Sequence, residues 1–229
     1  MKMNKKKVFV IALAVCLIAI LSAGTLAWFN ASDDITNKFL IADSDGDGTP
    51  DFSVEVWENE NDGDDTADAD GDGDNKITHA GNEYANIAPG DELAKNPTVE
   101  NTGDYDQWIR VFVTFDEWST IKAACERTQL ASGSDLRAWL NILPGWTAGD
   151  DAETVIANNQ ITYVYYLNNK LVKDDTATLF TTITIPAAFE QEDMRFVSGD
   201  FSVTVKAEAI QAANTGETAQ EAFANCWEY

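Results

Sequence analysis

Histidine, cysteine and basic residues are scarce in this sequence. Its 229 residues include a single histidine, His79, and three cysteines. One histidine cannot supply the two imidazoles of an H-E-x-x-H zinc site, and the chain also lacks a G-x-S-x-G motif and a P-loop. We therefore expect a protein that is not an enzyme, and we expect His79 to be a solvated loop residue.

The shortage of positive charge excludes two classes of partner. Fifteen Lys and Arg residues stand against 39 Asp and Glu residues, which gives a formal net charge of −24. So acidic a chain repels phosphate groups and anionic lipid headgroups. We therefore expect no binding to nucleic acid or to a membrane surface, and we expect divalent cations as counterions.

The only long apolar run is short for a membrane span. Residues 8–21 are fourteen apolar residues, whereas a spanning helix needs about 20. Four lysines precede the run and small residues follow it, which is typical of an export signal over residues 1–27. We expect cleavage between Ala27 and Trp28, and a secreted chain that is free of the membrane and lies in the matrix or at the cell surface. The alternative is a retained membrane anchor.

Cleavage there would also remove one of the three cysteines, Cys16. The mature chain keeps Cys125 and Cys226. In an exported protein they could form one disulfide, or they could remain two buried thiols. A bridge over so long a loop would contribute about 4 kcal/mol in the chain-entropy model.

The mature chain consists mainly of short segments with alternating apolar residues. The clearest alternation is over residues 201–209, and residues 108–115 are partly apolar on both faces, which favours a central strand. We also expect strands at 52–56, 96–100, 161–167 and 179–185. Turn residues separate them without βαβ alternation, so we predict an all-β fold, an antiparallel β-sandwich of jelly-roll type.

We expect a single folded domain with two additions. Residues 28–42 form an N-terminal arm, and residues 43–229 form the jelly-roll domain, with an acidic insertion at 43–83. Helix formers over 117–130 and 134–143 predict a helical insertion at 117–143, and a short helical turn is expected at 218–225.

Two acidic loops have the spacing of calcium ligands. In the first, alternate carboxylates lie in a Gly-rich stretch that resembles the loops of thrombospondin type-3 repeats. The second resembles an EF-hand loop, although Gly81 stands where that loop has its bidentate Glu. Converging carboxylates suit a cation that takes 6–8 oxygen ligands. The alternative is a pair of solvated loops. The candidate ligands are Asp43, Asp45, Asp47 and Asp51 in the first loop, and Asp70, Asp72, Asp74, Lys76 (through its carbonyl) and Thr78 in the second.

Several motifs together resemble one family. The junction Gly-Thr-Leu-Ala-Trp-Phe-Asn at residues 24–30 resembles those cut by the signal peptidase SipW. The Pro-Gly-Asp of residues 89–91 and the Asn-Thr-Gly of residues 101–103 resemble the strand-turn pair of the TasA and camelysin family, and residues 108–111 and 163–166 are similar to its later strands. Some camelysin relatives are described as metalloproteases, but this chain lacks the histidines for that chemistry.

The resemblance implies an exported matrix protein that assembles into biofilm fibres. In that family the N-terminal segment of one subunit completes the sheet of the next. Its partners here would be further copies of itself, a SipW-type signal peptidase and other matrix proteins. On this view residues 28–41 are the donor strand, and the candidate anchors are Trp28, Phe29, Phe39, Leu40 and Ile41.

Three alternatives remain open. The arm could be an edge strand paired within its own chain. The protein could instead be a monomeric calcium-stabilised adhesin or a carbohydrate-binding module, and it could keep its membrane anchor. Exposed tryptophans would favour sugar binding, but in a β-sandwich we expect most to pack in the core. The tryptophans concerned are Trp57, Trp108, Trp118, Trp139, Trp146 and Trp227.

Overall fold

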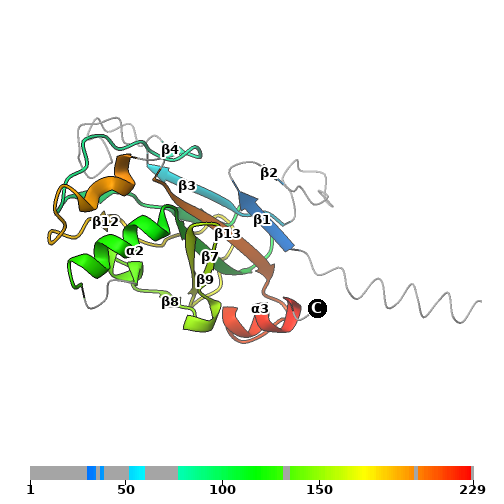
Figure 1. Cartoon of the computed structure of the whole chain (residues 1–229). Helices are drawn as coiled ribbons and strands as arrows, with labels where there is room; N and C mark the ends of the chain where they lie inside the picture. The colour runs from blue at the N-terminus through cyan, green and yellow to red at the C-terminus, as the bar shows by residue number, and fades with distance from the viewer. Residues whose placement is uncertain are drawn as a thin grey trace, which may run out of the picture.

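The computed structural model describes residues 30–34, 37–38, 52–59, 77–130, 135–198 and 201–227 (Figure 1). Every strand pairing within these ranges is antiparallel, which confirms the expected all-β class. The described helices, α2 (Trp118–Arg127) and α3 (Ala219–Trp227), are both too short to span a bilayer. The strands are β1 (Asn30–Asp34), β2 (Asn37–Lys38), β3 (Glu55–Asn59), β4 (Ile77–Thr78), β5 (Glu92–Ala94), β6 (Thr98–Glu100), β7 (Gln107–Phe115), β8 (Trp146–Ala148), β9 (Val155–Ala157), β10 (Gln160–Leu167), β11 (Thr176–Thr178), β12 (Thr182–Thr184) and β13 (Val203–Gln211).

The largest sheet is built around β7. Its strand order is β2-β1-β13-β7-β10-β8, and β9 pairs with the other end of β10. Val113 of β7 lies between Val205 of β13 and Tyr163 of β10. The two-sided apolar pattern of residues 108–115 therefore did predict a central strand.

The largest sheet has an apolar core on each face. One face, which includes Ile109 and Val111, packs against the smaller sheets β11-β6-β3-β4 and β12-β5 and against α2. The other face, which includes Trp108, packs against α3 through Phe223. Alternation along β7 sends successive side chains to opposite cores.

This arrangement separates the two cysteines. Cys125 lies on α2 in the first core, and Cys226 lies on α3 at the edge of the second core. Both are free thiols, so the disulfide that the sequence allowed is not formed. The sheet itself lies between the two helices.

Two elements differ from expectation. The helix expected at 134–143 is only a 3₁₀ turn, Leu136–Trp139, because Leu140 turns extended and forms a bridge to Ile183. The strand expected at 52–56 starts later, at Glu55. Phe52 and Val54 are nevertheless buried, so the apolar pattern marked core contacts rather than strand pairing.

The Pro-Gly-Asp turn joins β5 to the end of β12. Gly90 has a φ of +92°, a conformation that other residues rarely adopt. Its N–H donates to the carbonyl of Ile185 at 3.0 Å, and the N–H of Ile185 donates to the carbonyl of Asp91 at 2.8 Å. The Asp91 carboxylate accepts from the N–H of Ala88 at 2.7 Å, which closes the turn.

The Asn-Thr-Gly turn depends on the buried side chain of Asn101. Its backbone N–H donates to the carbonyl of Asp175 at 3.1 Å, and its own carbonyl accepts from the N–H of Asp174 at 2.9 Å. The side chain therefore sits where the β6–β7 connection meets the 171–175 loop. It makes four hydrogen bonds of 2.6–3.0 Å, with atoms of Gly103, Tyr105, Gln107 and Leu171.

Replacing Asn101 should destabilise the fold strongly. Asn101→Ala leaves several buried polar groups without a partner, and each such group costs about 1–3 kcal/mol. We expect the free energy of unfolding, measured by urea denaturation, to fall by about 3 kcal/mol. Asn169→Ala at an exposed turn is the control and should change it by less than about 0.5 kcal/mol. Equal effects of the two variants would contradict the role given to Asn101.

The free thiols should be unreactive in the folded protein. Burial raises the pKa of Cys125 to about 11, and burial also raises the pKa of Cys226. Since the thiolate is the reactive form, little of it exists at pH 8. A thiol reagent should modify Cys125 only after denaturation and Cys226 more slowly than free cysteine. Absence of both thiols from denatured, unreduced protein would show that a disulfide does form.

Candidate functional site

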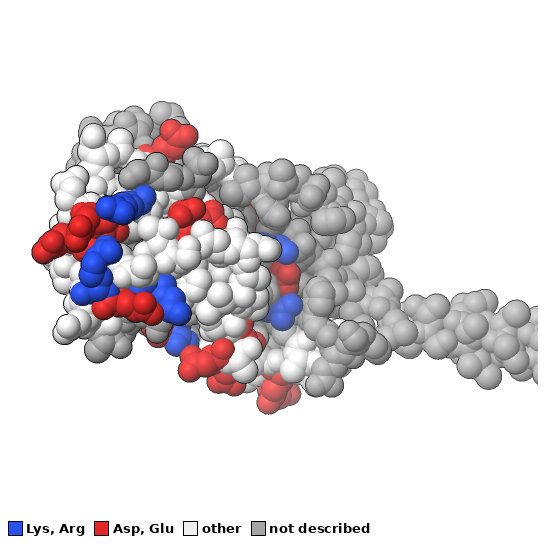
Figure 2. Space-filling view, viewed as in Figure 1, with Lys and Arg blue, Asp and Glu red and all other residues white. Residues whose placement is uncertain are grey.

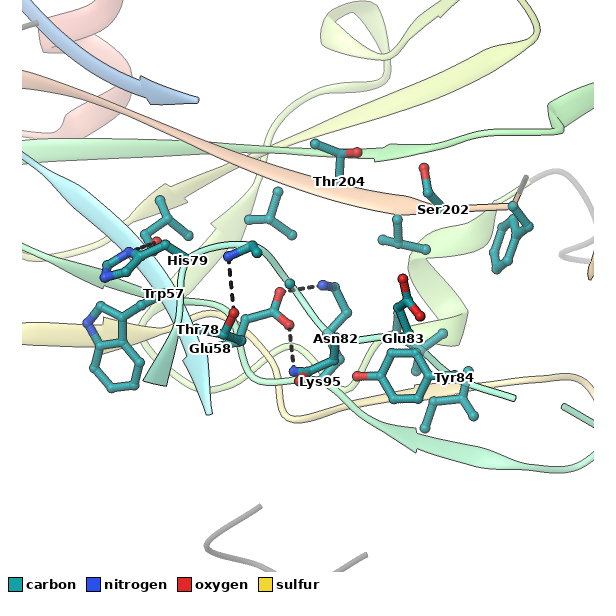
Figure 3. Close-up of a pocket in the computed structure, with 18 of the residues that line it drawn as sticks. Trp57, Glu58, Thr78, His79, Asn82, Glu83, Tyr84, Lys95, Ser202 and Thr204 are labelled. Carbon is teal, nitrogen blue, oxygen red and sulfur yellow. Dashed lines mark hydrogen bonds and ion pairs between the residues drawn. The ribbon is translucent and has the colours of Figure 1, made fainter. Parts of the chain in front are cut away.

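A groove of about 450 Å³ lies between β3, the segment after β4, and the start of β13 (Figure 3). We call it the β13 groove. Its volume is within the range of small-molecule sites, about 300–1,000 Å³. Residues that line it include Trp57, Glu58, His79, Tyr84, Lys95 and Val203.

A buried ion pair forms the polar side of the groove. Lys95 donates to Glu58, and each side chain is only 8% exposed. Asn82 donates to the second carboxylate oxygen of Glu58 at 3.2 Å and to the carbonyl of Asn59 at 2.8 Å. Figure 3 shows these side chains converging below β13. A buried charge needs such partners, because the loss of hydration would otherwise be uncompensated.

Two ring side chains complete this part of the groove. The Tyr84 hydroxyl donates to the carbonyl of Ala94. Burial, with the Glu58 carboxylate nearby, raises the pKa of Tyr84, so its hydroxyl stays neutral. His79 is exposed, as expected for a loop residue, and its Nδ1 lies 3.0 Å from the carbonyl of Val56.

The opposite side of the groove is an incompletely paired edge of β13. On one side β7 pairs with β13 over residues 203–211, but on the other side β1 covers only residues 207–210. Among the described residues, none pairs with the outer edge at 203–206. Residues 201–205 all line the groove, and Figure 3 shows the hydroxyl groups of Ser202 and Thr204 pointing away from Glu58 and Lys95.

Only Thr78 of the predicted calcium ligands falls within the described residues. Its hydroxyl oxygen accepts a hydrogen bond from the N–H of Ala80 at 3.1 Å. Among the residues that the structure covers, no group of three or more His, Cys, Asp or Glu could hold a metal ion. The predicted ligands outside them are Asp43, Asp45, Asp47, Asp51, Asp70, Asp72, Asp74 and Lys76.

The second acidic loop is an insertion between paired strands. Glu58 lies opposite Thr78, and Asn59 lies opposite Ile77, in the β3–β4 pair. The ends of the 60–76 segment are therefore adjacent. The two strands that bound this segment border the β13 groove, since Glu58 of β3 and Thr78 of β4 both line it.

Part of the predicted arm is an edge strand of its own chain. Asn30 lies opposite Ile210 and Asp33 lies opposite Ala207, while β2 folds back onto β1. This is the intrachain pairing that the sequence left open as an alternative to donation. The predicted cleavage site and anchors lie outside the described residues; they are Ala27, Trp28, Phe29, Phe39, Leu40 and Ile41.

Most of the tryptophans pack in the interior. Trp57 is half-buried and borders the groove, and its indole N–H donates to the Glu100 carboxylate at 3.0 Å. The side chain of Trp227 lies outside the described part of the chain. Trp57 is therefore the described tryptophan best placed to meet a ligand. The buried ones, each 3–8% exposed, are Trp108, Trp118, Trp139 and Trp146.

Acidic and basic side chains alternate over the face shown in Figure 2. Surface ion pairs occur among the described residues, as between Arg137 and Asp151, and Arg127 pairs with the buried Asp193. Within the described residues, nearby basic side chains therefore neutralise part of the acidic charge. Figure 2 shows no broad basic patch on this face among the described residues.

The ion pair in the groove should matter for stability mainly because it is buried. Lys95→Met leaves the Glu58 carboxylate buried and unpaired, so we expect a loss of about 3 kcal/mol in the free energy of unfolding. The double variant Lys95→Met, Glu58→Leu should recover most of that loss. The control is Lys122→Met, since Lys122 pairs with Glu126 at the surface, and it should cost less than about 1 kcal/mol. A double variant less stable than Lys95→Met would contradict this account.

Comparison with known proteins assigns no family. No protein-family model matches the chain, and no curated protein matches it.

Proposed function

We propose that the chain is an exported structural subunit of extracellular, biofilm-type fibres, and that subunits assemble by exchanging their N-terminal strands. The resemblance to the TasA and camelysin family motivates the proposal. The single observation that carries it is the position of β1 and β2 at one end of the largest sheet, where β13 is the strand of the described body that pairs with β1.

An edge strand can be exchanged at low cost. The described pairings of β1 are with β13 and with β2, its own hairpin partner. Withdrawing β1 and β2 together breaks one strand pairing, whereas β7 is held on both sides. A neighbour's β1 would restore the same hydrogen bonds, as in domain swapping.

A connection of thirteen residues would give the arm its reach. Thirteen residues, 39–51, join β2 to Phe52, and an extended chain of that length spans about 43 Å. Each subunit would donate its arm to the next and accept one from the previous subunit. Such a head-to-tail contact does not close on itself and therefore produces a filament.

The jelly-roll topology is part of the same proposal. Support comes from the core that the three sheets share. Ile109 of the largest sheet belongs to the same apolar cluster as Val99 of β6 and Ile183 of β12. Two facing layers of antiparallel strands are the basis of a jelly-roll sandwich.

Calcium is proposed as a stabiliser of the acidic loops at 43–51 and 70–78. The donor set consists of carboxylate, carbonyl and hydroxyl oxygens, which suit this cation. The oxygen of Thr78, which accepts one hydrogen bond, keeps a lone pair for a water-mediated contact. Bound calcium would reduce the repulsion between carboxylates close to the arm and to the groove.

Assembly should require the free N-terminal arm. We expect filaments in electron microscopy from a chain that begins at Trp28 and none from one that begins at Asp43, because the shorter chain has no strand to donate. The shorter chain keeps β13 and can still accept an arm. Added to the longer chain, it should therefore shorten the filaments.

Controls separate assembly from folding and from calcium binding. Circular dichroism should show that the shorter chain loses no β-content beyond that of β1 and β2, and a chelator should reduce assembly if calcium orders the arm. Filaments of unchanged length after addition of the shorter chain would contradict strand exchange. Finding Met1 at the N-terminus of exported protein would contradict release from the membrane.

The β13 groove favours one alternative function. A half-buried tryptophan beside buried polar groups suits a sugar, so the protein could be a monomeric calcium-stabilised adhesin or carbohydrate-binding module. In that case the chain beginning at Asp43 would keep its glycan binding, and Trp57→Ala would abolish it. Monomers under every condition would favour this alternative over fibres.

A further inference from the structure

Strand β9 exposes apolar side chains at the edge of the largest sheet that lies away from β1. All three of its residues, Val155–Ala157, are exposed; Val155 is 55% and Ile156 is 60% exposed. Its inner side pairs with β10, and its outer side has no strand partner within the described ranges. Soluble proteins usually protect such an edge with charges, proline or a bulge. This strand contains neither charge nor proline.

The strand is held in a fixed position. Asn158 and Asn159 have φ values of 52° and 62°, which make the two-residue turn of a tight hairpin with β10. Asn159 accepts from the N–H of Trp118 at 2.9 Å and, through its side chain, from the N–H of Ser119 at 2.8 Å. The hairpin therefore caps the N-terminus of α2, so its edge is preformed.

The hairpin register shows which backbone groups point outward. Ala157 lies opposite Gln160 next to the two-residue turn, and Ile156 lies opposite Ile161. Residues that flank such a turn form a hydrogen-bonded pair, and the next pair along does not. The N–H and C=O of Ile156 therefore point out of the sheet.

We propose that β9 is a self-association edge that pairs antiparallel with β9 of a second copy, around a twofold axis at Ile156. Each Ile156 donates its N–H to the carbonyl of the other, which closes two hydrogen bonds. The two Ile156 side chains pack against each other on the face of the first core, because Ile161 beside them is buried there. On the other face each Val155 packs beside Ala157 of the second copy.

Charge favours the antiparallel orientation over the parallel one. The acidic residues Asp150, Asp151 and Glu153 precede β9. A parallel pairing would bring the two acidic segments together. The antiparallel register instead places Glu153 opposite Asn159 of the other copy, which is a neutral residue.

The acidic segment is already ordered within its own chain. Asp151 accepts from Arg137 at 2.9 Å. Glu153 accepts from the hydroxyl of Tyr166 and from the N–H of Asp150 at 2.9 Å. Pairing of β9 therefore requires no rearrangement of these side chains.

The contact is small, so a single pair of chains associates weakly. Along a fibre the same contact repeats, and many weak contacts bind two fibres side by side. The inference does not depend on strand exchange, because β9 is far in strand order from β1.

Disulfide trapping tests the proposed register. In a Cys226→Ser background, Ile156→Cys places the two new thiols on residues whose Cα atoms are about 5.5 Å apart, within bonding range. Val155→Cys is the matched control, since residues 155 of the two copies are diagonal neighbours about 7–8 Å apart. Under mild oxidation we expect at least tenfold faster formation of a covalent dimer from Ile156→Cys. Equal rates for the two variants would overturn the register.

Charge substitution tests the surface without a cross-link. Ile156→Lys should reduce dimer formation in sedimentation velocity at least tenfold, and it should abolish side-by-side pairing of any fibres while leaving single fibres intact. Val172→Lys is the control, because Val172 is 41% exposed in another loop. An unchanged dimer population in Ile156→Lys, or monomers alone in the unsubstituted protein at millimolar concentration, would overturn the proposal. If only the chain without the arm failed to form fibres, that result would support strand exchange and would not test the pairing of β9.

Discussion

The buried amide pair of Asn101 and Gln107 is the constraint on which the start of β7 depends. Gln107 is fully buried and donates to the Asn101 side chain at 2.6 Å and to the carbonyl of Ser53 at 2.9 Å. Its backbone exchanges two hydrogen bonds with Leu171, at 2.8 and 2.9 Å. Three segments that are distant in sequence are thereby joined at one end of the central strand. Apolar contacts alone would not specify that register, because polar groups buried without partners are costly.

From that point β7 divides the interior into two cores, which explains the placement of both helices. The face toward α3 also contains a charge, the guanidinium of Arg110. It binds Glu208 through two nitrogens at 2.7 and 2.9 Å and lies 4.4 Å from the ring centroid of Phe223. Arg110 thus links the sheet to α3 through both charge and packing. The second core is small, and this contact helps to hold the C-terminal helix against it.

The sequence predicted those elements whose apolar side chains recur with a regular period. The alternation of β7 and β13 and the helix at Trp118–Arg127 were expected from periodicity, and the structure has them. The helix expected at 134–143 failed because the contact of Leu140 with Ile183 outweighs local propensity. The Lys95–Glu58 pair was missed, since its partners are 37 residues apart and neither has a local signal. The strand β9 was also missed, because its three residues are too few to show a period.

The pairing of β3 with β4 has a practical consequence for studies of assembly. Asn59 and Ile77 lie opposite each other, so the segment between them begins and ends at one place on the body. The entropy of closing a loop grows slowly with its length. A small epitope or a fluorophore-binding peptide inserted there would leave the strand registers unchanged. The body could thus carry a reporter at a defined position in every subunit.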